Sequence, residues 1–172
     1  YERRSPLLMR RIDSGPDYSQ LFTTFFNPEA NKEIAANSTH DMQEVIGASL
    51  AKAGLTINDI DFMVTHQPVA WAGNAWRECI GIPESKFYES FKKYGNIATA
   101  AVPTNLLEAI ELRRISAGDN IIFASPGAGE NHICIIMKIS PELVEYIHKT
   151  QAHTHSLNGK DHMVQRTQKA FE

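Results

Sequence analysis

The chain has 172 residues, of which 42% are hydrophobic and 22% charged, as is typical of one folded globular domain. A net charge of -3, without a cluster of lysines and arginines, gives no indication of nucleic-acid binding. No apolar run approaches the roughly 20 residues that cross a bilayer, and residues 1–6 lack the apolar core of a signal peptide. Cys79 and Cys134 lack metal-like spacing, so we expect a reducing compartment and a cytoplasmic protein.

The first 28 residues predict a strand followed by a loop. The chain opens without methionine and enters an apolar run at once, which suggests a fragment or a processed subunit. Residues 6–12 predict the strand, whereas Gly15, Pro16 and Pro28 surround an aromatic cluster at 21–26 that we interpret as a loop with buried rings. These rings are either ordinary packing or one wall of an apolar acyl pocket.

A helix and a buried strand are predicted next. Between Asp41 and Ala53 the apolar residues recur at helical spacing on one face, and they are Met42, Val45, Ile46, Leu50 and Ala53. Gly54 is placed to end this helix in a left-handed turn. Residues 60–65 form an apolar run that ends at His66 and Pro68, which predicts a buried strand.

Two further helices are predicted after His66. One carries a shared face of Val69, Ala72, Trp76, Cys79 and Ile80 and stops at Gly81 and Pro83. Phe87 and Tyr88 predict a short strand. Residues 98–115 predict another helix, with Pro103 tolerated in its first turn and a shared face of Val102, Leu106, Ala109, Ile110 and Arg113.

The chain then predicts two strands joined by a glycine-rich turn. Residues 120–125 and 133–137 are continuously apolar, so we expect both faces of both strands to be covered. The alternation of helices and strands predicts an α/β layered fold. After Ile139 the pattern breaks: residues 141–149 predict a short helix, and residues 150–172 are polar.

His66 and Asn96 are the main candidates for chemistry. Residues just past the carboxyl ends of strands line the ligand crevice of open α/β sheets, and His66 holds that position. Alone, His66 could be a base, a hydrogen-bond donor or a core residue. With Asn96, which follows Gly95, it could donate to one carbonyl oxygen that becomes an oxyanion or enolate. Cys79 and Cys134 are expected to be inert core thiols rather than nucleophiles.

The turn at 126–129 joins a strand to another strand, so it lacks the helix N-terminus of a phosphate loop. We expect it instead to bring a backbone N–H into a site. The histidines of the tail, His148, His153, His155 and His162, lack a fixed set of partners, so no metal site is predicted.

Together these motifs resemble a known family. Residues 61–67 (DFMVTHQ), 94–103 (YGNIATAAVP), Gly118-Asp119 and 126–129 (PGAG) are similar in order and spacing to the C-terminal half of beta-ketoacyl-acyl-carrier-protein synthase III. The resemblance covers roughly residues 6–139 and implies a thiolase-like α/β half fold, completed by an N-terminal half that is not in this chain. It divides the chain into a linking strand and loop (1–28), an α/β domain (29–139) and a C-terminal extension (140–172) that is partly helical or mobile.

The resemblance also implies an activity. In that family, a cysteine of the N-terminal half takes an acyl group from a thioester. Residues matching His66 and Asn96 then stabilise the enolate that forms when a malonyl-type thioester loses carbon dioxide. The backbone N–H of Ala128 would complete an oxyanion hole, and Gln67, Trp71, Gly127 and Gly129 would contact substrate. The substrates would be thioesters of acyl carrier protein or coenzyme A, with no cofactor, in fatty acid or polyketide biosynthesis, and the protein would dimerise.

Two departures from the family leave alternatives open. The usual Gly-Gly-Gly-Phe turn reads Gly127-Ala128-Gly129-Glu130, and Val69 and Trp71 replace an Asn and an Arg that often lie near the carrier entrance. One alternative is an acyltransferase of the same fold, in which an alcohol or amine attacks the acyl-cysteine and His66 is the general base. The other is a non-catalytic subunit that stabilises a partner synthase.

Overall fold

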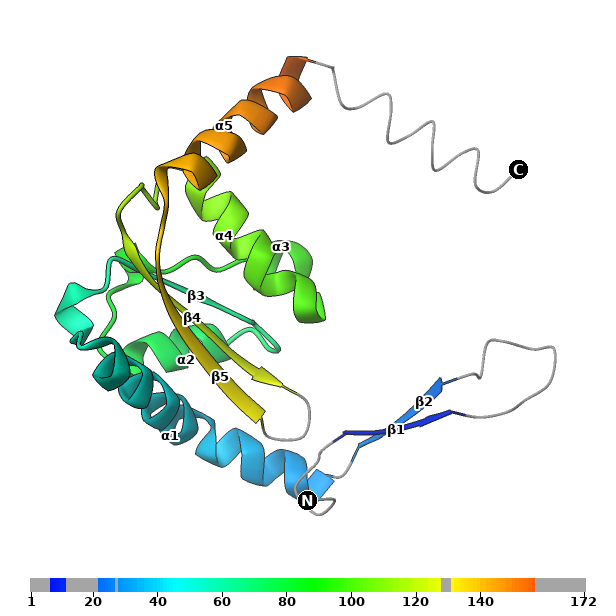
Figure 1. The fold of residues 1–172 in the computed structure, drawn as a ribbon. Coiled ribbons are helices and arrows are strands. Elements are labelled where there is room, and N and C mark those ends of the chain that lie inside the picture. The colour runs from blue at the N-terminus through cyan, green and yellow to red at the C-terminus, as the bar shows by residue number, and fades with distance from the viewer. Residues whose placement is uncertain (1–6, 12–21, 27, 128–130, 157–172) are drawn as a thin grey trace, which may run out of the picture.

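A computed structural model describes residues 7–11, 22–26, 28–127 and 131–156 of the chain (Figure 1). The strands are β1 (Leu7–Arg11), β2 (Phe22–Phe26), β3 (Phe62–Thr65), β4 (Asn120–Gly127) and β5 (Asn131–Lys138). The helices are α1 (Pro28–Ala53), α2 (Ala72–Cys79), α3 (Phe91–Tyr94), α4 (Ala101–Glu111) and α5 (Pro141–Ser156). Short 3-10 turns are formed by Ile57–Asp59, Glu84–Lys86 and Ala98–Ala100.

The described core is a three-stranded sheet in the order β3-β4-β5. β3 and β4 run parallel, with Phe62 opposite Ile121 and Thr65 opposite Ala124. β5 returns antiparallel to β4. The predicted short strand at Phe87 is reduced to a single parallel bridge with Met63. The mixed helix and sheet arrangement confirms the predicted α/β layered fold.

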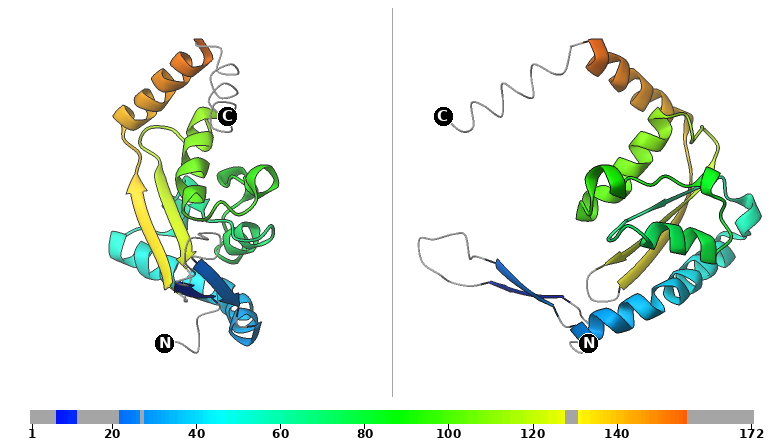
Figure 2. Two further views of the ribbon diagram at one scale, coloured as in Figure 1. Left: turned by 90° about the vertical axis from the view of Figure 1, so that its right-hand side faces the viewer. Right: turned by 180° about the vertical axis from the view of Figure 1, so that it is seen from behind.

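Helices cover both faces of this sheet (Figures 1 and 2). On one face α1 and α2 pack against the sheet through the buried residues Met42, Ile46, Leu50, Met63, Ala72, Trp76, Ile122 and Ala124. On the other face α4 and α5 pack through Phe62, Val64, Ala109, Ile110, Ile121, Ile139 and Ile147. These two layers position the carboxyl end of β3, which carries His66.

The prediction that both faces of β5 are covered is wrong for this chain. Alternate residues of β5 face opposite sides of the sheet: Cys134 and Ile136 pack under α1, and their neighbours point the other way. Ile133, Ile135 and Met137 are 56%, 52% and 40% exposed, and we call them the β5 strip. They lie opposite Ser125, Phe123 and Ile121, on the sheet face whose other strands α4 covers. Among the described residues, α1 covers one face of this edge strand and no helix covers the other.

Several other elements differ from their predictions. α1 begins at Pro28 rather than Asp41. Its first turns consist of helix-forming residues, but they carry no apolar stripe, so the sequence pattern did not reveal them. Residues 22–26, predicted as loop, are strand β2, which pairs with β1 in the register Leu7 to Phe26. Aromatic and β-branched residues suit such a strand. The β1–β2 hairpin extends away from the sheet (Figures 1 and 2).

The remaining helices differ mainly at their ends. α4 begins at Ala101 after a 3-10 turn and ends at Glu111, and Arg113 adopts a left-handed φ of 57° outside the helix. α2 begins at Ala72, so Val69 lies outside it and is 40% exposed. Gly54 has a φ of 65°, as predicted for the residue that follows α1. Within the described residues, no helix combines the length and apolar character that a bilayer crossing requires.

Candidate active site

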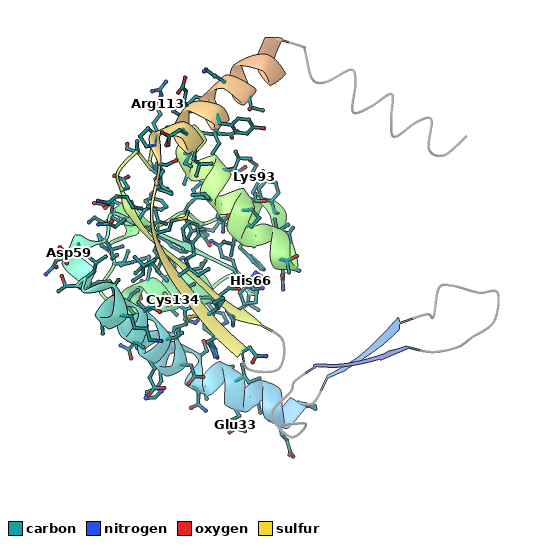
Figure 3. The ribbon with its side chains drawn as sticks, viewed as in Figure 1. Glu33, Asp59, His66, Lys93, Arg113 and Cys134 are labelled. Atoms are coloured by element: carbon teal, nitrogen blue, oxygen red, sulfur yellow. The ribbon has the colours of Figure 1, made fainter. Side chains whose placement is uncertain are left out.

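The position of His66 is set by hydrogen bonds on both sides of its own peptide unit. Its backbone N–H donates to the Ala124 carbonyl at 3.2 Å, which extends the β3–β4 pairing by one residue. The preceding Thr65 carbonyl accepts a 2.9 Å bond from Asn105 Nδ2, and the Asn105 side chain of α4 is fully buried. His66 therefore lies at the carboxyl end of β3 with little freedom to move its backbone (Figure 3).

The His66 ring is prepared to act as a neutral group. It is half-buried, and burial lowers the pKa of the imidazole below its ordinary value of 6.5. Nδ1 is enclosed and has no hydrogen-bond partner among the described residues. Because a buried, unpaired N–H is costly, the proton is expected on Nε2, which leaves that nitrogen as a donor.

His66 lines a mostly apolar cavity of about 400 Å³. Its walls come from α1, from the start of α2 and from the β4–β5 end, and comprise Ile34, Ala35, Ser38, Pro68, Val69, Trp71, Ala72, Trp76, Pro126, Gly127 and His132. The buried Trp76 Nε1 donates to Ser38 Oγ at 2.7 Å, which ties α2 to α1 at the cavity wall. A concave, apolar site with a few polar groups is typical of small-molecule pockets.

Asn96 is presented by a strained turn between α3 and α4. Gly95 has φ 67° and ψ -152°, a conformation that is essentially restricted to glycine. Asn96 is exposed, and its Oδ1 accepts a 2.9 Å hydrogen bond from the backbone N–H of Ala98. Ala98 itself has a left-handed φ of 50°. The bond to Oδ1 fixes the orientation of the amide, whose Nδ2 group is the donor of this side chain.

The structure brings only some of the predicted site residues together. His66, Trp71 and Gly127 line the same cavity, and Trp71 is 50% exposed there. Asn96 does not line it. The predicted contributions of Ala128 and Gly129 fall outside the described residues.

The predicted contact of Gln67 with substrate is not supported by its surroundings. The Gln67 side chain is 2% exposed. Its Nε2 donates to the Tyr88 carbonyl at 2.7 Å, and its Oε1 accepts 2.9 Å bonds from the backbone N–H groups of Ser90 and Phe91. The amide is therefore engaged by the backbone of the segment that leads into α3.

A second polar cluster beside Asn96 was not predicted. The Glu108 carboxylate, 9% exposed on α4, accepts hydrogen bonds from Tyr88 Oη at 2.7 Å, from Lys93 Nζ at 2.5 Å and from Tyr94 Oη. We call these four residues the Glu108 cluster. An acidic residue within the apolar stretch of α4 was the available signal, but only the fold shows that its partners come from the segment before Asn96.

The cluster shifts the pKa values of Glu108 and Tyr88 in opposite directions. Burial favours a neutral Glu108, but the hydrogen bonds from Lys93, Tyr94 and Tyr88 together outweigh it and lower the pKa of the carboxyl. Burial and the bond to this carboxylate raise the pKa of Tyr88 to about 12. At neutral pH the cluster is therefore a carboxylate held by two phenols and an ammonium group.

Neither cysteine has the environment of a nucleophile. Burial raises the pKa of both thiols, and neither residue lines the His66 cavity. Cys79 Sγ contacts the Trp76 carbonyl, and Cys134 packs on the α1 side of β5. The prediction that both are inert core thiols agrees with these surroundings.

Comparison with known proteins identifies the class. Residues 50–139 match the family described as 3-Oxoacyl-[acyl-carrier-protein (ACP)] synthase III C terminal. The matched region contains His66, Asn96 and the β4–β5 pair, and the chain belongs to this family.

Individual relatives agree with that assignment. The chain is 38% identical over 98 residues to beta-ketoacyl-acyl-carrier-protein synthase III 2 of Vibrio vulnificus, covering 57% of this chain and 27% of the relative. It is 34% identical over 98 residues to the synthase III of Geobacillus kaustophilus, covering 57% of this chain and 32% of that relative. The chain thus spans about a third or less of these relatives.

Solved structures support the same fold. The synthase III of Thermus thermophilus is 27% identical with a TM-score of 0.62, covering 76% of this chain and 41% of that one. The synthase III of Aquifex aeolicus is 25% identical with a TM-score of 0.62, covering 80% of this chain and 46% of that one. The described fold therefore corresponds to part of a thiolase-fold protein, as predicted.

Proposed function

We propose that this chain supplies the enolate-stabilising part of a ketoacyl synthase III-type active site. The reaction is the decarboxylative Claisen condensation of an acyl thioester with a malonyl-type thioester. His66 Nε2 and Asn96 Nδ2 donate to the thioester carbonyl of the extender as carbon dioxide leaves and negative charge moves onto the oxygen. The observation that carries the proposal is the place of His66 at the carboxyl end of β3, beside a cavity that an extender could enter, where burial lowers the pKa of the imidazole.

The two donors suit this charge because both are held before substrate arrives. The His66 backbone is bonded to β4, and the Asn96 amide is oriented by Ala98. A donor aimed at a developing oxyanion contributes about 2.7–4 kcal/mol to the barrier by removal. The Ala128 N–H would add a further donor to the oxyanion hole. In the sequence, Ala128 lies between Gly127, which lines the cavity, and Gly129.

The substrates are proposed to be thioesters of acyl carrier protein or coenzyme A, since the relatives are named for acyl carrier protein. The cavity entrance carries Val69 and Trp71, which are 40% and 50% exposed. Both side chains offer apolar surface, so we expect contact with the apolar parts of the carrier arm rather than with its phosphate.

The acyl-accepting cysteine is proposed to come from a complementary half of the fold. Two observations support this. Burial raises the pKa values of the Cys79 and Cys134 thiols, and neither residue lines the cavity. The β5 strip exposes adjacent apolar side chains, as expected of a surface that another structural layer covers.

A second candidate is acyl transfer to an alcohol or amine by the same fold. It is favoured by the cavity, which includes His66 but not Asn96. His66, neutral at physiological pH, would then remove the proton of the incoming nucleophile.

One assay separates the two reactions. The chain is combined with the complementary half of a related synthase, and release of labelled carbon dioxide from malonyl-carrier is followed with and without an acyl donor. Condensation predicts release that depends on the acyl donor and yields a ketoacyl product. Acyl transfer to hydroxylamine or an alcohol without carbon dioxide release would support the second candidate and contradict the first.

A further inference from the structure

Gln67 is the residue that follows His66, and its side chain bonds to the segment that precedes Asn96. Its amide bonds to backbone groups of Tyr88, Ser90 and Phe91, with distances of 2.7, 2.9 and 2.9 Å. Ser90 is itself 2% exposed, so these bonds form in a site shielded from water. Hydrogen bonds in such a site are demanding in geometry, because an unmade partner would remain buried and unpaired.

The same segment is held from its other side by the Glu108 cluster. Lys93 and Tyr94 form the last turn of α3, and both donate to the Glu108 carboxylate on α4. Tyr88 joins the two holds, because its carbonyl accepts from Gln67 and its hydroxyl donates to Glu108. Residues 88–94 are thus fixed between Gln67 on one side and Glu108 of α4 on the other.

Asn96 lies two residues after this fixed segment. α3 ends at Tyr94, and Gly95 then turns the chain so that Asn96 starts the turn into α4. The preceding Thr65 carbonyl is bonded to Asn105 of α4 as well. The place of Asn96 relative to His66 is therefore determined by bonds that begin on both neighbours of His66.

We propose that Gln67 is a positioning residue, whose buried amide sets the distance and orientation of Asn96 relative to His66. Its own contact with substrate is not required, because the side chain is shielded and its amide is bonded to backbone. This inference rests on the proposed function for its catalytic consequence. Its structural part, the hold of Gln67 on Asn96, stands without that function.

The test compares three variants of the full chain. Gln67→Met removes the three bonds to backbone groups at nearly constant volume, whereas Gln67→Glu keeps an acceptor for Ser90 and Phe91 and loses the donor to Tyr88. Gln43→Met is the matched control, because Gln43 Nε2 also donates to a backbone carbonyl, that of Cys79, at 2.6 Å but on an exposed surface. The readouts are the NMR signals of the Asn96 side-chain amide and the Ala98 backbone amide, and the kinetics of condensation with the complementary half.

We expect both NMR signals to shift in Gln67→Met, to shift less in Gln67→Glu, and to stay in place in Gln43→Met. In the complemented enzyme, Gln67→Met should lower kcat about 10- to 100-fold with a smaller change in KM, since misplacing a catalytic group by about 1 Å has effects of this size. Gln67→Glu should restore part of the rate.

Unmoved Asn96 and Ala98 signals in folded Gln67→Met would overturn the inference, whatever the activity. If Gln67→Met does not fold, the same two signals in Gln67→Glu decide: shifts support the inference and unmoved signals overturn it. A parent chain without condensing activity would defeat the proposed function instead, and would leave the NMR comparison valid.

Discussion

Replacing Glu108 with glutamine tests whether the Glu108 cluster holds α3 in place. The substitution keeps the size of the side chain but removes the negative charge that accepts from Tyr88 and Tyr94. Hydrogen bonds to a charged group contribute about 1.5–3 kcal/mol, compared with about 0.5–1.5 kcal/mol between neutral groups. The hydrogen bonds from the two phenols therefore each weaken by about 1 kcal/mol. The bond from the exposed Lys93 adds little because water screens it.

The expected loss is about 2 kcal/mol in the free energy of unfolding, which lowers the melting temperature of a chain this size by about 4–8 °C. Thermal unfolding followed by circular dichroism measures it. Glu111→Gln is the control, because Glu111 lies on the same helix but outside the cluster. The parent should also lose stability as the pH falls below 4.5, the ordinary pKa of a glutamate, and through the lower folded-state pKa of Glu108.

Glu108→Gln should lack this part of the acid sensitivity. At the alkaline end, the pKa of Tyr88, raised to about 12, means that its contribution is present below pH 10, its ordinary pKa, and is lost as the pH rises toward 12. If Glu108→Gln and Glu111→Gln melted together and had the same pH profile, the cluster would not hold α3 as described.

Three further predictions concern the turn, the strip and the histidine. Gly95→Ala should destabilise the chain by about 1–3 kcal/mol in denaturant unfolding, because the φ and ψ of Gly95 exclude a Cβ, whereas Gly47→Ala, with open space around its Cβ in α1, should be neutral or stabilising. Ile135→Glu should reduce self-association or pairing with the complementary half in sedimentation while leaving the fold intact, whereas Ile136→Glu should unfold the α1 side of the sheet; equal effects of the two would contradict the assignment of faces. An NMR titration should place the folded-state pKa of His66 below 6.5. Stability and activity are then full above pH 6.5, and the contribution of the neutral ring to stability is lost as the pH falls from 6.5 through the folded-state pKa. A folded-state pKa above 6.5 would contradict a neutral, buried ring.

Local patterns in the sequence were enough to predict much of the fold. The apolar run before His66 and the two strands that follow α4 were each recognisable without structural information. The start of α1 was not, because residues 28–40 have no apolar stripe, so periodicity gives no signal there. The exposure of Ile133 and Ile135 was also hidden, because a continuous apolar run does not say which neighbour covers each face.

The candidate site was predictable in part. His66 follows a strand directly and Asn96 follows Gly95, so both could be chosen from their places in the chain. The roles of Gln67 and Glu108 could not, because each depends on partners that only the fold brings near. An amide beside a catalytic candidate suggests substrate contact, whereas the burial of Gln67 and its bonds to the backbone of Ser90 and Phe91 are the basis of the positioning role proposed for it.

The central claim is tested most directly by carbon dioxide release from malonyl-carrier in the complemented enzyme. His66→Ala and Asn96→Ala should each lower this rate about 100- to 1,000-fold, as loss of one oxyanion donor does in acyl-transfer enzymes. Both variants should still assemble with the complementary half. Rates equal to the parent in both variants, at unchanged assembly, would show that these residues do not stabilise the enolate.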